Sequence, residues 1–186
     1  MKLNEILLSE DVVKSINDNI DYLLEIIPEI KKMIGFEHKN PHHHLDVFNH
    51  TLLALSLSKN DLDVRLCLLL HDIGKPYSYQ ETNDGFRHYY NHPKISAQMS
   101  KSILERLGFE EDYIKYICYL IEHHDSPIKN DQIEDNYELC LKLFEIQRCD
   151  ALAHNPEKLE KRKIYLEKTK KLINKSSDKN DKKWFL

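Results

Sequence analysis

The chain has 186 residues, which is enough for one domain of ordinary size with a full hydrophobic core. It contains only four glycines and six prolines, and this composition favours helices over a β-sandwich or a barrel. The formal net charge of −4 gives no support for a protein that coats nucleic acid or a membrane surface, although it is compatible with a local basic patch. We therefore expect an all-α, single-domain helical bundle.

The cysteines and the apolar runs indicate the cellular environment. The four cysteines are far apart, and none belongs to a Cys-x-x-Cys pair. Three of them lie within apolar helical patterns, which is typical of reduced core thiols. The N-terminus leads into a charged amphipathic segment instead of a signal peptide, and no apolar run approaches the roughly 20 residues of a membrane span. These features predict a cytoplasmic protein without a membrane segment.

Residues 1–36 are predicted to form helices that cover the core. Between residues 9 and 33, apolar side chains recur at helical spacing, and Ser9 is a candidate N-cap. Pro28 is expected to break or restart this segment. Nothing in this region suggests a function of its own.

Histidines become frequent after residue 41. Residues 42–44 are a histidine triplet in a predicted loop, which could be an adventitious metal-binding tract. A helix is predicted over residues 47–57 with His50 on its apolar face, where a lone histidine is more often a hydrogen-bonded core residue than a ligand. Asp46 lies one turn before His50, so it could either join a site with His50 or cap the helix.

The most informative stretch is an apolar segment that ends in His71 and Asp72. An imidazole and a carboxylate are costly to bury without a partner, and a divalent cation is the usual partner of both residue types. Adjacent helical residues point about 100° apart, so both can reach one ion only near a helix end. Gly74 and Pro76 predict such an end.

Residues 77–90 are predicted to form an irregular loop around an Asn-Asp-Gly turn. The loop ends at His92, and a helix is predicted from about Pro93 to Leu107. The positive end of the helix dipole favours a neutral imidazole at His92, which is the form that binds a metal.

Two later helices carry polar residues on their apolar stripes. Over residues 112–124 the periodicity favours His124 as the inward residue, with His123 as the alternative. In the next helix Asp150 falls on the core stripe, where it requires hydrogen-bond donors or a metal. The last helix, over residues 156–174, is rich in Lys and Glu and is predicted to be a solvated outer helix.

The order of these histidines and aspartates resembles the HD-domain superfamily of metal-dependent phosphohydrolases, and most of all the HD domain of bacterial tRNA nucleotidyltransferases. The resemblance covers about residues 41–156 and implies an all-helical fold. Together with the patterns at the two ends of the chain, it predicts N-terminal helices that pack on the core (1–36), an HD domain (37–156), an outer helix (157–175) and a flexible tail (176–186). The motifs that carry it are Leu45-Asp46-Val47-Phe48-Asn49-His50-Thr51-Leu52, Leu68-Leu69-Leu70-His71-Asp72-Ile73-Gly74-Lys75-Pro76, Asn91-His92-Pro93, Leu120-Ile121-Glu122-His123-His124-Asp125 and Arg148-Cys149-Asp150-Ala151-Leu152-Ala153.

The resemblance implies a set of metal ligands. Four residues match the ligands common to the superfamily, and members with two metals use two further histidines. All six are present here, so the resemblance favours a binuclear site with Asp72 as the bridge and a metal-bound hydroxide as the nucleophile. The expected cofactor is one or two divalent ions (Fe, Mn, Co, Ni, Zn or Mg), among which the sequence does not choose. The implied ligands are His50, His71, Asp72, Asp150, His92 and His124, with His123 as the alternative to His124.

Other residues are candidates for substrate contact. Lys75 follows Asp72 closely and is placed to pair with a substrate phosphate as a second catalytic residue, whereas a solvated loop lysine is the alternative. Arg148 and His88 are weaker candidates for substrate binding.

Two departures from the resembled proteins narrow the expected function. No nucleotidyltransferase head is recognisable before residue 41, so tRNA end repair does not transfer to this chain. Asp125-Ser126-Pro127 stands where a Gly-Tyr-Pro motif would follow the paired histidines, which argues against the branch that cleaves cyclic di-GMP.

The expected function is therefore metal-dependent hydrolysis of a nucleotide or another small-molecule phosphate ester, as a monoesterase or a phosphodiesterase. The alternative is a non-catalytic, metal-containing module that binds nucleotide or RNA. A third hypothesis treats the histidines as core residues without a metal. The sequence does not predict the oligomeric state.

Overall fold

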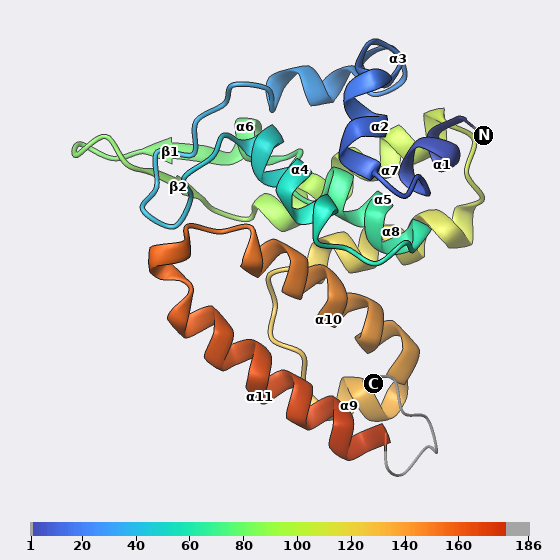
Figure 1. The fold of residues 1–186 in the computed structure, drawn as a ribbon, viewed down its shortest axis with the longest axis vertical. Coiled ribbons are helices and arrows are strands. Elements are labelled where there is room, and N and C mark those ends of the chain that lie inside the picture. The colour runs from blue at the N-terminus through green and yellow to red at the C-terminus, as the bar shows by residue number, and fades with distance from the viewer. Residues whose placement is uncertain (1, 178–186) are drawn as a thin grey trace.

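The structure is a computed structural model and describes residues 2–177. This part of the chain is almost entirely helical, with one small hairpin (Figure 1), so the predicted all-α class is confirmed. In chain order the elements are α1 (Lys2–Leu7), α2 (Val12–Asp18), α3 (Ile20–Ile26), η1 (Pro28–Lys32), α4 (Val47–Ser56), α5 (Leu62–Leu70), α6 (Lys75–Ser78), β1 (Tyr79–Glu81), β2 (Arg87–Tyr89), α7 (His92–Arg106), α8 (Glu111–His123), α9 (Asn130–Asp135), α10 (Tyr137–Leu152), η2 (Pro156–Lys158) and α11 (Glu160–Ser177).

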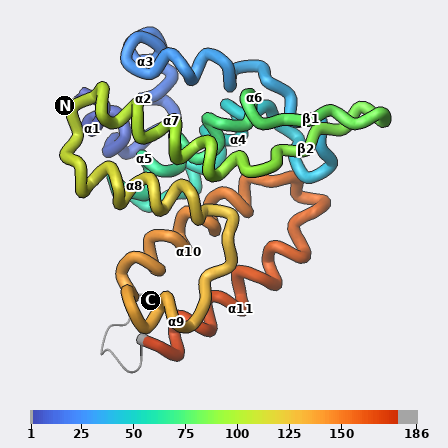
Figure 2. The backbone as a smooth tube through the Cα atoms, turned by 180° about the vertical axis from the view of Figure 1, so that it is seen from behind, coloured from blue at the N-terminus to red at the C-terminus, as the bar shows by residue number. Residues whose placement is uncertain are grey.

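Helix α5 forms the centre of the fold. It packs against α4, α8 and α10, and every side chain from Val64 to Leu70 is buried. Figure 2 shows α7 and α8 side by side next to it, in agreement with their many contacts. Because other helices surround α5, the residues that directly follow its last turn lie in the interior of the bundle.

The N-terminal segment contains three short helices and a 3-10 turn, which begins at Pro28, where the sequence predicted a break or restart. The N-cap of α2 is Asp11, whose carboxylate accepts a hydrogen bond from the Lys14 amide, and it is not Ser9 as predicted. The Arg65 guanidinium accounts for the tight attachment of this segment to α5. It is buried and donates to the Leu7 and Ser9 carbonyls at 2.6 and 2.8 Å, and so satisfies carbonyl groups at the end of α1.

The predicted loop over residues 77–90 contains a two-stranded antiparallel hairpin, β1–β2, which projects from the bundle (Figure 1). Its register pairs Tyr79 with Tyr89 and Glu81 with Arg87. Gly85, with φ of +81°, closes the turn in a conformation that favours glycine. Side chains alternate along β2, so Tyr89 and His88 face opposite ways.

The C-terminal helices form a second group, in which α11 packs against α10 and α9. Helix α11 is mostly exposed, as predicted, and has a sparse buried stripe that includes Leu166 and Ile173. The predicted flexible tail falls largely outside the described residues. Within residues 2–177, no helix is both long and apolar enough to cross a membrane.

Candidate metal centre

The structure brings the six predicted ligands together from five helices. His50 lies in the middle of α4, and His71 caps the C-terminus of α5. His92 opens α7, His124 caps the C-terminus of α8, and Asp150 lies near the end of α10. Asp72 follows His71 in the turn after α5. Five of the six are buried, and the His92 side chain is 12% exposed.

Asp72 lies at the centre of this group. One carboxylate oxygen, Oδ2, is 3.2 Å from His71 Nε2 and 3.7 Å from His50 Nε2. The other oxygen, Oδ1, is 3.5 Å from His92 Nε2. On the opposite side, Asp150 Oδ1 is 2.9 Å from His50 Nε2 and 3.7 Å from His71 Nε2. The two oxygens of Asp72 therefore face different histidines, as a bridging carboxylate would.

Backbone carbonyls fix the orientation of all four imidazoles. In each ring Nδ1 donates to a carbonyl, so Nε2 is the nitrogen left for the centre. Metal-binding histidines are oriented in this way by their outer hydrogen bonds. The four contacts are His50 with Ala153 (3.2 Å), His71 with Leu68 (2.7 Å), His92 with Tyr89 (3.0 Å) and His124 with Ile121 (2.7 Å).

Buried polar atoms without well-formed hydrogen bonds indicate that this donor set fits a metal. His71 Nε2 and both Asp72 oxygens are buried without a well-formed hydrogen bond, although buried polar atoms normally have one. Ligand atoms of His50, His71 and Asp150 lie within 4.8 Å of one another, and so do those of His71, Asp72 and His124. Imidazole and carboxylate donors suit divalent transition ions. These residues could hold one or two such ions.

Burial and charge set the protonation of the histidines. Burial lowers the pKa of His92 to about 3 and also lowers the pKa of His124. Burial opposes the charge on His71 as well, but Asp72 and Asp150 outweigh it and raise the pKa of His71 to about 10. Burial likewise opposes ionisation of Asp72, but His71 and Lys75 outweigh it and hold its pKa well below the usual value. At neutral pH His71 therefore carries a proton between two carboxylates.

A comparison with known protein families identifies this arrangement. The model of the HD domain family matches residues 42–173. The chain belongs to the HD domain family. This confirms the resemblance inferred from the motifs, and the matched span contains all six residues of the centre.

Curated relatives of the chain are tRNA nucleotidyltransferases. The chain is 32% identical over 114 residues to an A-adding tRNA nucleotidyltransferase of Deinococcus radiodurans, which is 58% of this chain and 26% of that protein. It is 25% identical over 132 residues to a CC-adding tRNA nucleotidyltransferase of Thermus thermophilus, 68% of this chain and 29% of that protein. A multifunctional CCA protein of Azoarcus is 29% identical over 141 residues, 73% and 32% of the two chains. The chain therefore spans about a quarter to a third of the length of these relatives.

In this HD domain His124, not His123, faces the centre. The His124 ring lies 5.0 Å from His71 and 5.3 Å from His92, measured between ring centroids. His123 instead stacks on Tyr119 at 4.1 Å and donates to its carbonyl. The structure thus follows the preference that the periodicity gave.

Asp46 and Lys75 have structural roles that the sequence left open. Asp46 caps α4 by accepting a hydrogen bond from the Asn49 amide at 2.9 Å. Lys75 is only 4% exposed, so it is not a solvated loop lysine. Its Nζ lies 2.7 Å from Asp72 Oδ2 and 3.2 Å from His38 Nε2. Lys75 therefore balances the charge of Asp72 at Oδ2, whereas His92 is nearest to Oδ1.

The structure does not bring the two weaker substrate candidates to the centre. The Arg148 guanidinium pairs with Glu145 at 2.7 Å and donates to the Leu57 carbonyl. His88 is exposed on β2 and stacks on Tyr90. The alternation along β2 turns His88 outward and Tyr89 towards the HD centre.

A cavity of about 180 Å³ opens onto four of the six candidate ligands, Asp72, His92, His124 and Asp150. A larger hollow of about 650 Å³ lies between α7 and α8, but none of the six candidate ligands lines it. The smaller cavity is the better candidate for a binding or catalytic site, because charged and imidazole groups converge on it. It is lined by His43, Asp72, Lys75, Tyr89, His92, His124, Asp125, Asp150, His154 and Arg162.

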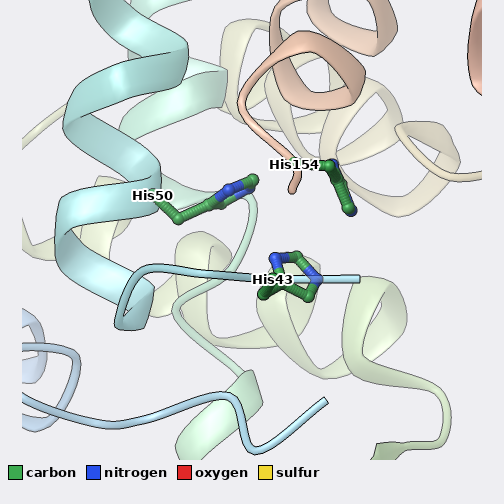
Figure 3. A group of neighbouring side chains, drawn as sticks. All are labelled: His43, His50 and His154. Carbon is green, nitrogen blue, oxygen red and sulfur yellow. The ribbon is translucent and has the colours of Figure 1, made fainter. Parts of the chain in front are cut away.

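Three histidines near the centre were not predicted as site residues. His43 and His154 lie beside His50 (Figure 3), and ligand atoms of these three lie within 4.8 Å of one another. His38 is buried, stacks on His43 and accepts from Lys75. His154 could have been predicted as a site residue from its spacing, because it lies one helical turn after Asp150. No sequence pattern marks His38, whose position depends on the fold.

Proposed function

We propose that this HD domain is a metal-dependent phosphohydrolase that acts on a nucleotide or another phosphate ester. The observation that supports it is Asp72, a fully buried carboxylate whose oxygens lack well-formed hydrogen bonds and which faces oriented imidazoles at the wall of a cavity. A divalent ion held by these residues would activate water and neutralise charge on phosphoryl oxygens.

The residues of the chain would contribute in separate ways. His92 and His124 are neutral because burial lowers their pKa values, so they are ready to act as ligands at neutral pH. Lys75 reaches the cavity wall while it pairs with Asp72, and it adds positive potential where a phosphate would enter. Lys75 thus has a position from which it can assist substrate binding.

The names of the relatives favour one second candidate function. They are tRNA nucleotidyltransferases, so the domain could instead be a metal-containing module that binds RNA or nucleotide without hydrolysis. A structural metal site is usually closed by its ligands. The cavity beside Asp72 therefore supports the hydrolase more than the binding module.

Replacement of Asp72 by Asn tests the proposal, because it keeps the size of the side chain and removes its charge. Changes around metal ligands typically cost about 10–100-fold in affinity or activity, so we expect Asp72→Asn to reduce kcat/KM by about 100-fold or more. The assay is phosphate release or diester cleavage by metal-loaded protein across a panel of nucleotides and phosphoesters. Asp112→Asn, an exposed carboxylate on α8, is the matched control and should retain activity.

Two results would contradict the hydrolase. The first is metal-loaded wild-type protein that is inactive on the whole panel. The second is turnover that persists in Asp72→Asn. Inactive protein that binds RNA, and whose melting temperature falls in Asp72→Asn, would support the binding module instead.

A further inference from the structure

A second cavity adjoins the candidate metal centre. It has a volume of about 240 Å³ and lies between the end of α8, α10 and the beginning of α11. His124, Asp125, Asp150 and Arg162 line both cavities, so the two are neighbours across a common wall. Together they fall within the size range of a typical small-molecule pocket, about 300–1,000 Å³.

Arg162 stands at the junction of the two cavities. Its Nη1 is 4.0 Å from Asp150 Oδ2, and its side chain is 36% exposed. An ion pair this long and this exposed contributes little stability. The guanidinium is therefore free to turn towards a phosphate, which arginine binds with two parallel hydrogen bonds. Lys161 precedes it and also lines the second cavity.

Hydrogen bonds hold the walls of the second cavity in place. Gln147 donates to the Ser126 carbonyl at 2.7 Å and accepts from the Tyr165 hydroxyl at 2.8 Å. The Tyr165 hydroxyl in turn accepts from the Ile128 amide at 3.3 Å. These bonds connect α10, α11 and the segment after α8. The cavity is thus formed in advance, and a ligand would not need to order it.

The lining of this cavity suits an organic group that is partly apolar. Pro127, Ala151 and Tyr165 supply apolar and aromatic surface, and Asp125 supplies an exposed carboxylate in the shared wall. Bases stack favourably on aromatic side chains, and a carboxylate can accept hydrogen bonds from sugar hydroxyls.

We propose that the second cavity binds the nucleoside part of a nucleotide, while Arg162 contacts the phosphoryl group at the junction. This inference rests on the proposed phosphohydrolase function and narrows its substrates to nucleotides. It assigns substrate binding to the first turn of α11. The sequence had suggested only a solvated outer helix there.

Calorimetric titration of the full chain loaded with Mn²⁺ tests this proposal without relying on turnover. The probes are inorganic phosphate and a nucleotide that cannot be turned over, the phosphonate analogue of adenosine 5′-monophosphate. We expect the wild type to bind the nucleotide at least about 10-fold more tightly than phosphate. Hydrogen bonds to charged groups contribute about 1.5–3 kcal/mol, so Arg162→Ala should weaken nucleotide binding by about 10-fold or more.

Two further variants make the result specific. Arg162→Lys keeps the charge but loses the planar fork, so its affinity should lie between those of the wild type and Arg162→Ala. Lys163→Ala removes an exposed cation on the same helix that lines neither cavity, and it should bind the nucleotide within about twofold of the wild type. Thermal melting checks that each variant is folded, and Arg162→Lys replaces Arg162→Ala if the latter is not.

The outcomes separate this inference from the proposed function. Nucleotide binding no tighter than phosphate binding, or equal affinities for Arg162→Ala and Lys163→Ala, would overturn the nucleoside cavity. Those results would not contradict the proposed phosphohydrolase function if Asp72→Asn still abolishes turnover. Binding that depends on Arg162 in a protein without turnover would support the cavity and contradict the hydrolase.

Discussion

At the scale of single residues, proton and metal compete for one place in the centre. His71 lies between Asp72 and Asp150, and their charges raise its pKa to about 10 despite its burial. The proton on Nε2 thus occupies the position that faces both carboxylates. A metal ion can bind His71 only after this proton has left, because the neutral imidazole is the ligand.

Metal binding at pH 7 should therefore release roughly one proton from His71 per chain, since pH 7 is far below a pKa of about 10. His92 and His124 should release none, because burial already lowers their pKa values. Calorimetric titration of metal in buffers with different ionisation enthalpies counts the protons. The affinity should rise with pH towards 10. Metal binding without proton release, or with affinity independent of pH, would contradict this protonation state.

The residues of the centre differ in how well sequence predicts them. His124 and Asp150 were predictable because helical periodicity places them on apolar stripes, and His71 and Asp72 because they end a continuous apolar segment. Arg162 and His38 carry no such signal. Their positions depend on how α11 and the segment before α4 pack against the bundle, which is a tertiary property that local spacing does not encode.

At the scale of elements, the turn after α5 places Asp72 by a close approach to α7. The Gly74 amide donates to Ser96 Oγ at 3.0 Å. A Cβ on Gly74 would lie 2.7 Å from the Ser96 backbone nitrogen and 3.0 Å from Ile95 Cγ2. Glycine is therefore required here because there is no space for a side chain. The backbone conformation is not the reason, since φ of Gly74 is in the ordinary negative range.

Gly74→Ala should push α7 away from the turn and so displace His92 from Asp72. Overpacking of this kind typically costs about 1–3 kcal/mol, and metal affinity should fall together with stability. Gly85→Ala is the control, because the hairpin turn has open space around it but a positive φ. Gly85→Ala should lower the free energy of unfolding by about 1 kcal/mol, because of the positive φ, and leave metal affinity unchanged. Denaturant unfolding measures the change in stability, and metal titration measures the change in affinity. Unchanged metal affinity in Gly74→Ala would show that the contact between Gly74 and α7 does not position the site.

The hairpin shows where element prediction fails. Each strand has only three residues, which is shorter than the windows that reveal a period of two. The Asn-Asp-Gly turn was visible in the sequence, but the pairing of Tyr79 with Tyr89 required the fold. The long helices, by contrast, were predicted to within a few residues, because their apolar stripes extend over several turns.

At the scale of the whole molecule, the candidate ligands connect helices that are far apart in sequence. They extend from His50 in α4 to Asp150 in α10, and each of the long helices in this span (α4, α5, α7, α8 and α10) carries a candidate ligand in it or at its end. A ligand that binds only the folded chain stabilises it by mass action, about 2.7 kcal/mol at a concentration 100 times its Kd. We expect metal to act on global stability and not on one helix.

Metal at that excess should raise the melting temperature of protein stripped with chelator by roughly 5–10 °C, given the size of the chain. Calorimetry or circular dichroism during heating measures the shift. Asp72→Asn should lose most of it. An equal shift in wild type and variant would indicate that the metal binds elsewhere, for example at the exposed histidine His42 or His44.

The most direct test of the candidate centre is the metal content of the purified protein. The chain should be loaded separately with Mn, Fe, Co, Ni and Zn, passed through a desalting column and analysed for bound metal. The geometry of His50, His71, Asp72, His92, His124 and Asp150 predicts one or two ions per chain with at least one of these metals, and a large loss in Asp72→Asn. Wild-type protein that retains essentially no metal under every loading condition would contradict the centre, and these histidines would then be core residues.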